Sequence, residues 1–218
     1  MATLIANTIS NGTTTDDIDT TGATLLVIIG GGTSLATMSA SDNKSNVWTE
    51  LTDHPSGDGD CRLAYVVNPT VGTGHNFSIA SGSDKVIAVL AFSGVNAFDQ
   101  QSGAINSTTP GSITPAVDNE VLVLGGVTND GEFDTVDSGF TLIGEVPFDV
   151  HVGLASCYQI QTTATARNPA LTGAATTTKS VAMASFMVAG SVYPKTVRLQ
   201  TNKRITLQSG VGRLRMQA

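Results

Sequence analysis

The sequence is poor in charged residues, in cysteine and in long apolar runs. Charged residues make up 13% of the 218 residues, and no segment has the alanine, leucine, glutamate and lysine that surface helices use, which argues against a helical fold. The longest apolar run, Leu25 to Ile29, is far shorter than a membrane span. The first residues have neither a basic segment nor a sustained apolar run, so we expect no signal peptide and synthesis in the cytoplasm.

The sequence also lacks the motifs of catalysis and of cofactor binding. It contains no nucleophile elbow and no paired-histidine zinc helix, and the glycines at 30–32 precede no helix that would hold a phosphate. His54, His75 and His151 stand apart and share no motif with a serine, a cysteine or a carboxylate. We therefore expect no enzymatic activity, no cofactor and no metal site.

Two cysteines offer little for a disulfide framework. Cys61 and Cys157 fall on corresponding predicted strands of a repeat, but at different distances from the tyrosine that each strand carries, so their side chains need not meet. Synthesis in a reducing cytoplasm keeps thiols reduced. Two buried thiols are therefore preferred over a Cys61–Cys157 disulfide, which is the alternative.

The main positive feature is a stretch that the chain contains twice, at about residues 23–95 and 119–190. Four pairs of anchors keep the copies in step at separations between 92 and 96 residues: Leu25 with Val121, Trp48 with Phe140, Tyr65 with Tyr158, and Phe92 with Phe186. A nearly constant offset over four positions indicates two copies of one structural unit.

Short apolar or alternating segments between Gly, Asn, Asp and Pro turns predict five strands in each copy. The predicted strands are 25–29, 47–51, 62–67, 75–80 and 85–92 in the first copy, and 121–124, 140–146, 153–160, 166–172 and 180–188 in the second. Residues 3–9 predict a further strand, and residues 96–118 are expected to link the copies. The sequence thus predicts an all-β fold, a single jelly-roll-like sandwich of about ten strands over residues 1–191, with two separate small sandwiches as the alternative.

Charge is distributed unevenly between this body and a C-terminal arm, residues 192–218. The arm has no acidic residue and six basic ones, which are the candidate partner-binding residues: Lys195, Arg198, Lys203, Arg204, Arg213 and Arg215. The other five basic residues and all 18 acidic residues lie in 1–191, so the body carries about −13 and the arm +6. Alternating segments in the arm predict short strands that are too few for a core of their own. A docking arm for an acidic protein surface is preferred over a nucleic-acid-binding tail.

Several segments of the repeat match a known sequence pattern. AFSGVNAFD at 91–99 stands where that pattern has A-Y-R-G-V-D, and TPAVDNEVLVL at 114–124 matches the start of its second half. In these segments the chain resembles a β-sandwich module of phage head and tail accessory proteins and of bacterial surface proteins. The resemblance covers about residues 23–190 and excludes the arm. It implies a module on a virion or a cell surface and no enzymatic activity, although the proline that usually precedes the aromatic turn is absent.

Aromatic and acidic residues are candidate binding sites, but a structural role is preferred for each. Trp48 would suit sugar stacking, but its alternating context favours a core position, as it does for Tyr65 and Tyr158. The acidic stretches 57–60 and 129–137 offer oxygen ligands but lack the spacing of the twelve-residue calcium loop, so solvated turns are expected.

Taken together, the sequence predicts a non-enzymatic structural virion protein of a tailed phage, made in the host cytoplasm and serving as a capsid decoration protein or a head fibre. Its expected partners are other virion proteins and further copies of itself in a homo-oligomer, reached through the basic arm; neither nucleic acid nor a membrane is expected. The alternative is a tail-associated protein or a cell-surface, adhesin-like module whose loops 53–60 and 129–138 bind a host glycan.

Overall fold

The longest apolar runs form the central strands of two sheets. Leu25 to Ile29 opens β2 (Leu25–Thr33), and the matching run of the second copy opens β9 (Val121–Thr128). The computed structural model describes residues 1–33, 35, 37–57, 59–79, 83–129, 131–146, 152–173 and 179–190. Every regular element in this part of the chain is a β-strand, and no helix there is long and apolar enough to cross a membrane. The predicted all-β class is confirmed.

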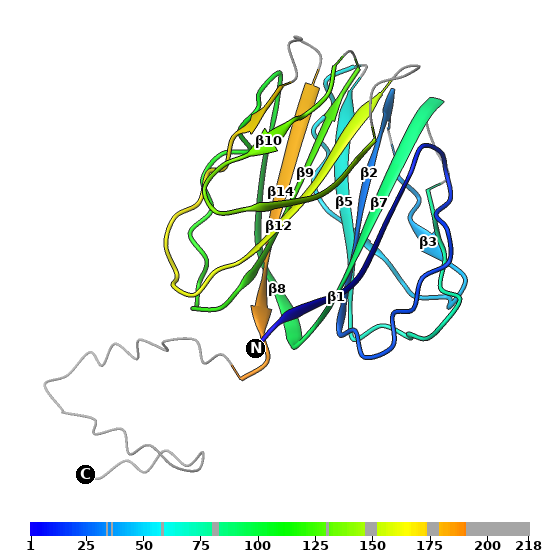
Figure 1. Ribbon diagram of the computed structural model, residues 1–218, viewed down its shortest axis with the longest axis vertical. Helices are drawn as coiled ribbons and strands as arrows, with labels where there is room; N and C mark the ends of the chain where they lie inside the picture. Colours follow the sequence, from blue (N-terminus) through cyan, green and yellow to red (C-terminus); the bar gives the residue numbers. More distant parts are fainter. Residues whose placement is uncertain are drawn as a thin grey trace, which may run out of the picture.

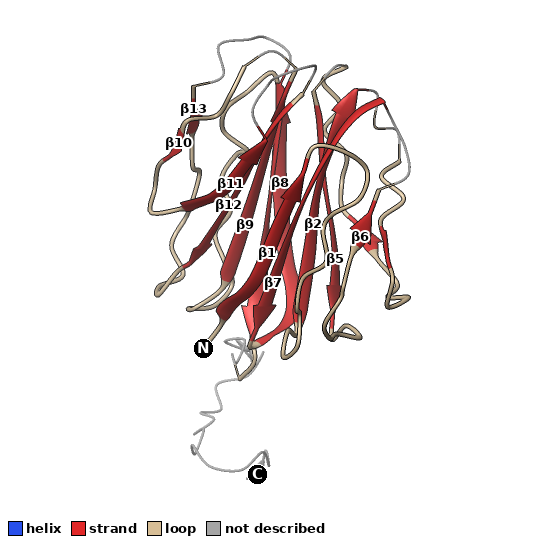
Figure 2. Cartoon of the chain, turned by 45° about the vertical axis from the view of Figure 1, so that its right-hand side comes forward, coloured by secondary structure: helices blue, strands red, loops and turns tan. Residues whose placement is uncertain are grey.

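Two antiparallel sheets of five strands pack face to face (Figures 1 and 2). The first sheet has the spatial order β1 (Thr3–Ser10), β7 (Ser83–Ser93), β2, β5 (Asp60–Val67) and β4 (Thr49–Glu50). The second has the order β8 (Val95–Ile105), β14 (Lys179–Val188), β9, β12 (Gly153–Ile160) and β11 (Thr141–Val146). The predicted sandwich of about ten strands is therefore confirmed.

The two sheets are built in the same way, one from each half of the chain. β2, β5 and β7 occupy the same places in the first sheet as β9, β12 and β14 do in the second. All strands of the first main sheet precede those of the second in the chain. In a jelly roll the chain passes back and forth between the two sheets, so the order of the strands here differs from the predicted jelly-roll-like arrangement. The sequence repeat thus corresponds to two equivalent sheets.

Each repeating unit begins one strand earlier than the sequence indicated. β1 precedes the first copy and β8 precedes the second, and each forms the edge next to the last strand of its own copy. The prediction that residues 96–118 form a linker is wrong for its first part, because β8 extends to Ile105. Two register shifts against β14 interrupt the alternation of apolar and polar residues in β8 and hide the strand in the sequence.

Short strands outside the main sheets replace the strands predicted at 75–80 and 166–172. β6 (Phe77–Ser78) pairs with β3 (Ser41–Asp42), and β13 (Leu171–Thr172) pairs with β10 (Thr135–Val136). These short strands and the loops around them lie over the outer faces of the main sheets.

Buried side chains from these covering segments pack on both outer faces. Leu35, Met38 and Ile79 lie with Phe77 over the outer face of the first sheet, and Ile113, Phe133 and Phe140 lie with Leu171 over that of the second. Each sheet is therefore covered on both sides, by the other sheet and by its own loops.

The central strands are buried on both faces. In β2, Leu25, Val27 and Ile29 point between the sheets, while Leu26 and Ile28 point to the outer layer. β9 alternates in the same way between the inner core and its own outer layer. This double burial is why both strands are continuous apolar runs in the sequence.

At two pairs of equivalent positions in β2 and β9, one strand has a glycine where the other has a large side chain. A side chain at Gly125 would overlap Ile29, which is the equivalent residue of the first copy. Conversely, a Cβ at Gly31 would lie 2.5 Å from Cγ2 of Val127, which is its own equivalent. At each of these two positions, the large side chain of one copy packs against the glycine of the other, so the two sheets approach closely.

We expect Gly125→Ala to lower the free energy of unfolding by about 1–3 kcal/mol, because the new methyl group overpacks the contact with Ile29. Denaturant unfolding of the full chain measures the change. In an Ile29→Ala background the same substitution should cost much less, since the overlapping group is gone. An equal cost in both backgrounds would contradict this account of the interface.

Candidate functional site

The six candidate partner-binding residues lie outside the described residues. Lys195, Arg198, Lys203, Arg204, Arg213 and Arg215 all follow Gly190, the last residue that the structure describes. β14 ends at Val188, at the same end of the sandwich at which β1 begins (Figure 1). We call this end the base and define it by Met1, Gly94 and residues 117–120 and 188–190. In the sequence, the arm follows directly from the base.

Gly94 brings three parts of the chain together at the base. It joins β7 to β8 with a φ of +73°, a conformation that favours glycine. A Cβ there would lie 2.6 Å from the carbonyl oxygen of Met1, and the Gly94 carbonyl accepts a hydrogen bond from Ala189 N–H at 2.8 Å. The first residue, the junction of the two copies and the end of β14 are thus held side by side.

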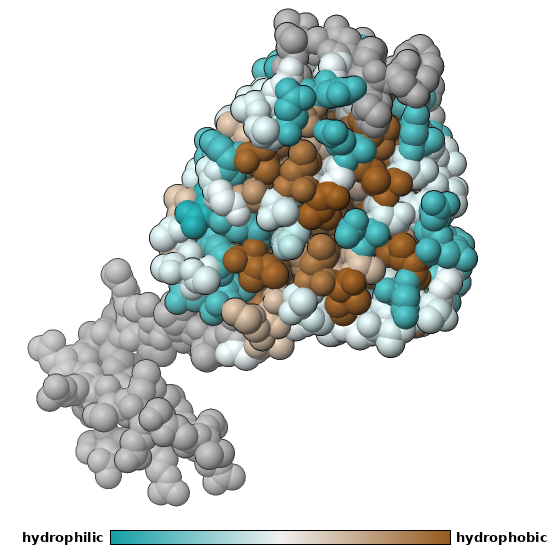
Figure 3. Space-filling model, in the orientation of Figure 1, coloured by the Kyte–Doolittle hydropathy of each residue, from teal (hydrophilic) through white to brown (hydrophobic). Residues whose placement is uncertain are grey.

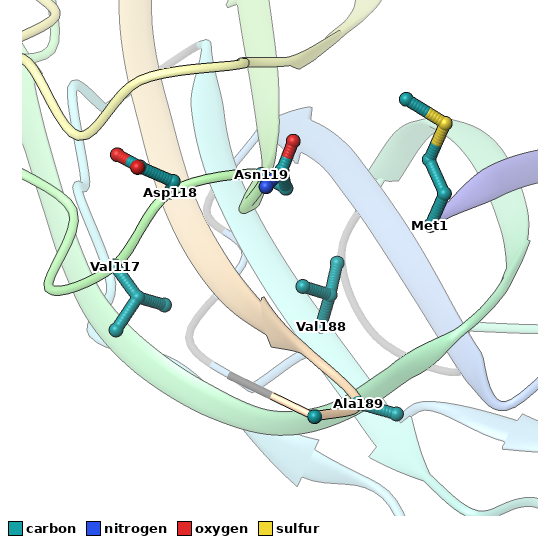
Figure 4. A pocket seen from close by; sticks show the side chains of 7 residues that line it. Met1, Val117, Asp118, Asn119, Val188 and Ala189 are labelled. Carbon is teal, nitrogen blue, oxygen red and sulfur yellow. The ribbon is translucent and has the colours of Figure 1, made fainter. Parts of the chain in front are cut away.

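An open hollow of about 580 Å³ lies at the base. Figure 4 shows that its walls come from Met1, from the loop before β9 and from the end of β14. Among the described residues that line it, Asp118 is the one acidic residue, and none is a lysine or an arginine. The hollow therefore presents a negative side chain close to the point in the sequence where the basic arm begins.

Two acidic side chains come together beside the hollow. Oδ2 of Asp99, in β8, accepts hydrogen bonds from Ala116 N–H at 3.1 Å and from the Ser185 hydroxyl at 3.3 Å. Oε1 of Glu120, immediately before β9, accepts one from Val117 N–H at 3.0 Å. The two carboxyl groups together hold the loop before β9 against the second sheet.

Glu120 is held in an environment that disfavours its charge. The residue is fully buried, and Oε2 has no hydrogen-bond partner within the described part of the chain. Gln161, whose backbone N–H donates to the Glu120 carbonyl at 3.1 Å, is also buried, and its side-chain amide has no partner there either. Burial raises the pKa of Glu120 from 4.5 to about 7, and the charge of Asp99 contributes to the rise. Glu120 therefore takes up a proton near neutral pH.

A second polar cluster fixes the loops above the first sheet. Arg62 donates to Glu50 at 2.9 Å and to Asp53 at 2.8 Å. Asp60 is 2% exposed, and its carboxylate accepts the N–H groups of Leu35 and Ser56, both at 2.7 Å. The expectation of a solvated turn at 57–60 is therefore wrong for Asp60, which is a buried structural residue. Asp58 lies outside the described residues.

A third cluster places a hydroxyl, an imidazole and a carboxylate in sequence. Thr20 Oγ1 lies 2.8 Å from His75 Nδ1, and His75 Nε2 lies 3.7 Å from Asp42 Oδ2. Thr20 and His75 are fully buried, and Thr20 Oγ1 is also bonded to the N–H and the carbonyl of Gly72. Burial lowers the pKa of His75, which keeps the imidazole neutral. With no access for a substrate, this arrangement holds loops together.

The three aromatic candidates all make structural contacts. The Trp48 indole N–H donates to Asp42 at 2.9 Å, and its ring meets Phe77 edge to face. The Tyr65 ring stacks on Phe98 with a centroid separation of 5.2 Å. The Tyr158 ring packs edge to face on Phe92, at 5.6 Å. The preferred core role of these residues agrees with their contacts.

The acidic loop 129–137 serves partly as a cover for the second sheet. Phe133 is buried against that sheet, Asp134 N–H donates to the Thr172 carbonyl, and Asp137 Oδ1 accepts Ala170 N–H. Within the described ranges, no group of three or more His, Cys, Asp or Glu residues could hold a metal ion. Asp130 and His151 lie outside those ranges.

Both cysteines are buried free thiols. Cys61 points into the core between the sheets, whereas Cys157 points to the outer layer of the second sheet. The preferred interpretation of two buried thiols is therefore confirmed. Burial raises the pKa of both, that of Cys157 to about 12.

Sequence reasoning did not identify the pair formed by Asp99 and Glu120. The residues are 21 positions apart, and only the pairing of β8 with β14, and of β14 with β9, brings them together. The available signal was a glutamate directly before a buried apolar run with no basic residue nearby.

Comparison with known proteins found no similar sequence or structure: no family model, no curated protein and no solved structure matches the chain.

The free energy of unfolding should depend on pH through Glu120. The folded chain binds this proton with a pKa of about 7, whereas the unfolded value is near 4.5, so the stabilisation is complete below pH 4.5 and is lost as the pH rises through 7. We expect a loss on the order of 3 kcal/mol over this range, and Glu120→Gln should remove this pH dependence. Urea unfolding between pH 4.5 and 8 measures the slope. The matched control Glu132→Gln, at an exposed position, should keep the slope, and an unchanged slope in Glu120→Gln would contradict the assignment.

Neither thiol should react with a water-soluble disulfide reagent while the chain is folded, because thiol attack requires an accessible thiolate. Absorbance titration should give close to zero reacting thiols in buffer and both thiols in denaturant. Rapid reaction of the folded chain would show that one of the buried positions is wrong.

Proposed function

We propose that the chain is a non-enzymatic structural protein of a tailed-phage particle, a capsid decoration protein or head fibre, which the basic arm 192–218 anchors to the particle. The observation that carries the proposal is the separation of charge, with about −13 on the body and +6 on the arm. The arm follows the base in the sequence, and the rest of the sandwich extends away from the base (Figure 1). An arm that follows the base in the sequence would hold the body at one end.

The polar clusters of the body support a structural role. Arg62, Asp60 and His75 are buried. Asp60 binds a loop backbone, Arg62 binds Glu50 of the neighbouring strand β4, and His75 binds Thr20 of another loop. These groups stabilise loops that cover the sheets and leave no reactive group exposed among them. The resemblance to a module of phage accessory proteins points to the same role.

The arm would attach by adding strands to a partner's sheet. Its segments at 196–200, 204–208 and 212–217 alternate apolar with polar residues, as strands with one buried face do. Backbone hydrogen bonds supply affinity in such additions, and side chains set the register. Arginine and lysine would add attraction to an acidic surface and speed the encounter.

Replacing the six basic residues of the arm by glutamine should reduce incorporation into phage particles more than about tenfold, because the attraction to an acidic partner is lost. Immunoblotting of purified particles measures incorporation, and thermal unfolding should show an unchanged body. A control in which the four arginines of the arm become lysines keeps the charge and should retain most of the incorporation. Normal incorporation of the glutamine variant would overturn the proposal.

The same full-length chain should be applied to a glycan array. A structural anchor predicts no saccharide binding. Specific binding to one saccharide class would favour the adhesin-like alternative instead.

A further inference from the structure

The free edge of β1 is the least protected edge of the sandwich. Among the described strands, β1 pairs with β7 only. It contains no charged residue and no proline, which usually block edge pairing, and its one irregularity is a bulge between Leu4 and Ala6. The other edges are less open. β4 is two residues long, β11 carries the charged Glu145, and β8 is covered because Gln100 bonds to the Thr114 carbonyl and Gln101 bonds to Thr52. β1 is thus the edge most open to a further strand.

Side chains of β1 that point inward pack against the core, while others along the strand are exposed. Ile9 packs against Gly144 of β11, where a Cβ would lie 3.5 Å from the Ile9 side chain. Toward the base, Thr3, Ile5 and Asn7 are exposed, and Ile5 retains 38% of its accessible surface. Figure 3 shows hydrophobic residues among polar ones on the face that β1 crosses in Figure 1. The edge Thr3–Asn7, which has a bulge at Ile5, therefore remains available, and its length matches that of one arm segment.

The direction of the chain favours an arm from another copy. β14 runs toward the base and β1 runs away from it (Figure 1), so the chain's own arm, turning back after Gly190, would run parallel to β1. Parallel pairs are slightly less stable per residue than antiparallel ones. An arm from a second copy approaches without this restriction and can pair in the antiparallel direction. The opposite charges of body and arm also favour contact between copies.

We propose that the edge Thr3–Asn7 of β1 accepts a strand from the basic arm of a second copy of this chain. The inference rests on the proposed role of the arm as an anchor and names the surface that receives it. Successive copies joined in this way form a homo-oligomer in which each arm covers the apolar edge of a neighbour.

Disulfide trapping tests the proposal on the full-length chain. One version carries Asn7→Cys and a second, of different mass, carries Thr206→Cys in the arm; the native thiols are buried and do not compete. After mild oxidation of the mixture, we expect a disulfide-linked heterodimer of the two versions. Val47→Cys, at a position 87% exposed outside β1, replaces Asn7→Cys as the control and should give at least about tenfold less heterodimer.

A charge at the edge provides a second measurement. Ile5→Lys places a positive side chain against the basic arm and should weaken self-association at least about tenfold in sedimentation velocity, whereas Val47→Lys should not. Three results would each overturn the inference. The first is equal trapping from position 47, and the second is unchanged association of Ile5→Lys. The third concerns a variant with both Asn7→Cys and Thr206→Cys in one chain, and is a disulfide that forms only within that chain. Loss of particle incorporation on neutralising the arm, without trapping at β1, would leave the anchor role standing and reject this receiving edge.

Discussion

Close contact between β2 and β9 is the constraint on which the rest of the structure depends. Each strand is buried on both faces, so each sheet must be covered by its twin on one side and by its own loops on the other. Ile29 packs against Gly125, and Val127 packs against Gly31. Because each contact pairs a large side chain with a glycine, the two backbones can approach closely. Polar loop clusters are needed because covering loops have few regular backbone hydrogen bonds of their own.

The fold was predictable to the extent that the repeat preserves apolar anchors. Runs such as Leu25 to Ile29 fit only central strands in an all-β chain, and their recurrence indicates a second equivalent sheet. β8 was missed because two register shifts against β14 break its alternation. The strands expected at 75–80 and 166–172 were mistaken for members of the main sheets because cover strands and sheet strands both alternate. Local sequence does not distinguish them.

The candidate site was predictable only in part, since the sequence gives the number of charged residues but not their positions in the folded chain. The separation of acidic body and basic arm follows directly from the sequence. The environment of Glu120 does not, because it depends on Asp99 and Gln161, which arrive from distant strands. Asp60 likewise looks like part of a polar turn, and its burial follows from three backbone groups that it binds across separate loops.

The meeting of Met1, Gly94 and Ala189 has a practical consequence for anyone attaching a label to this chain. These residues share one end of the sandwich, whereas the last residues of β2 and β9 and the first residues of β7 and β14 lie at the other. A fusion at Met1 would therefore crowd the side from which the arm departs. A peptide inserted next to the distant strand ends would be displayed at the opposite pole, away from the base.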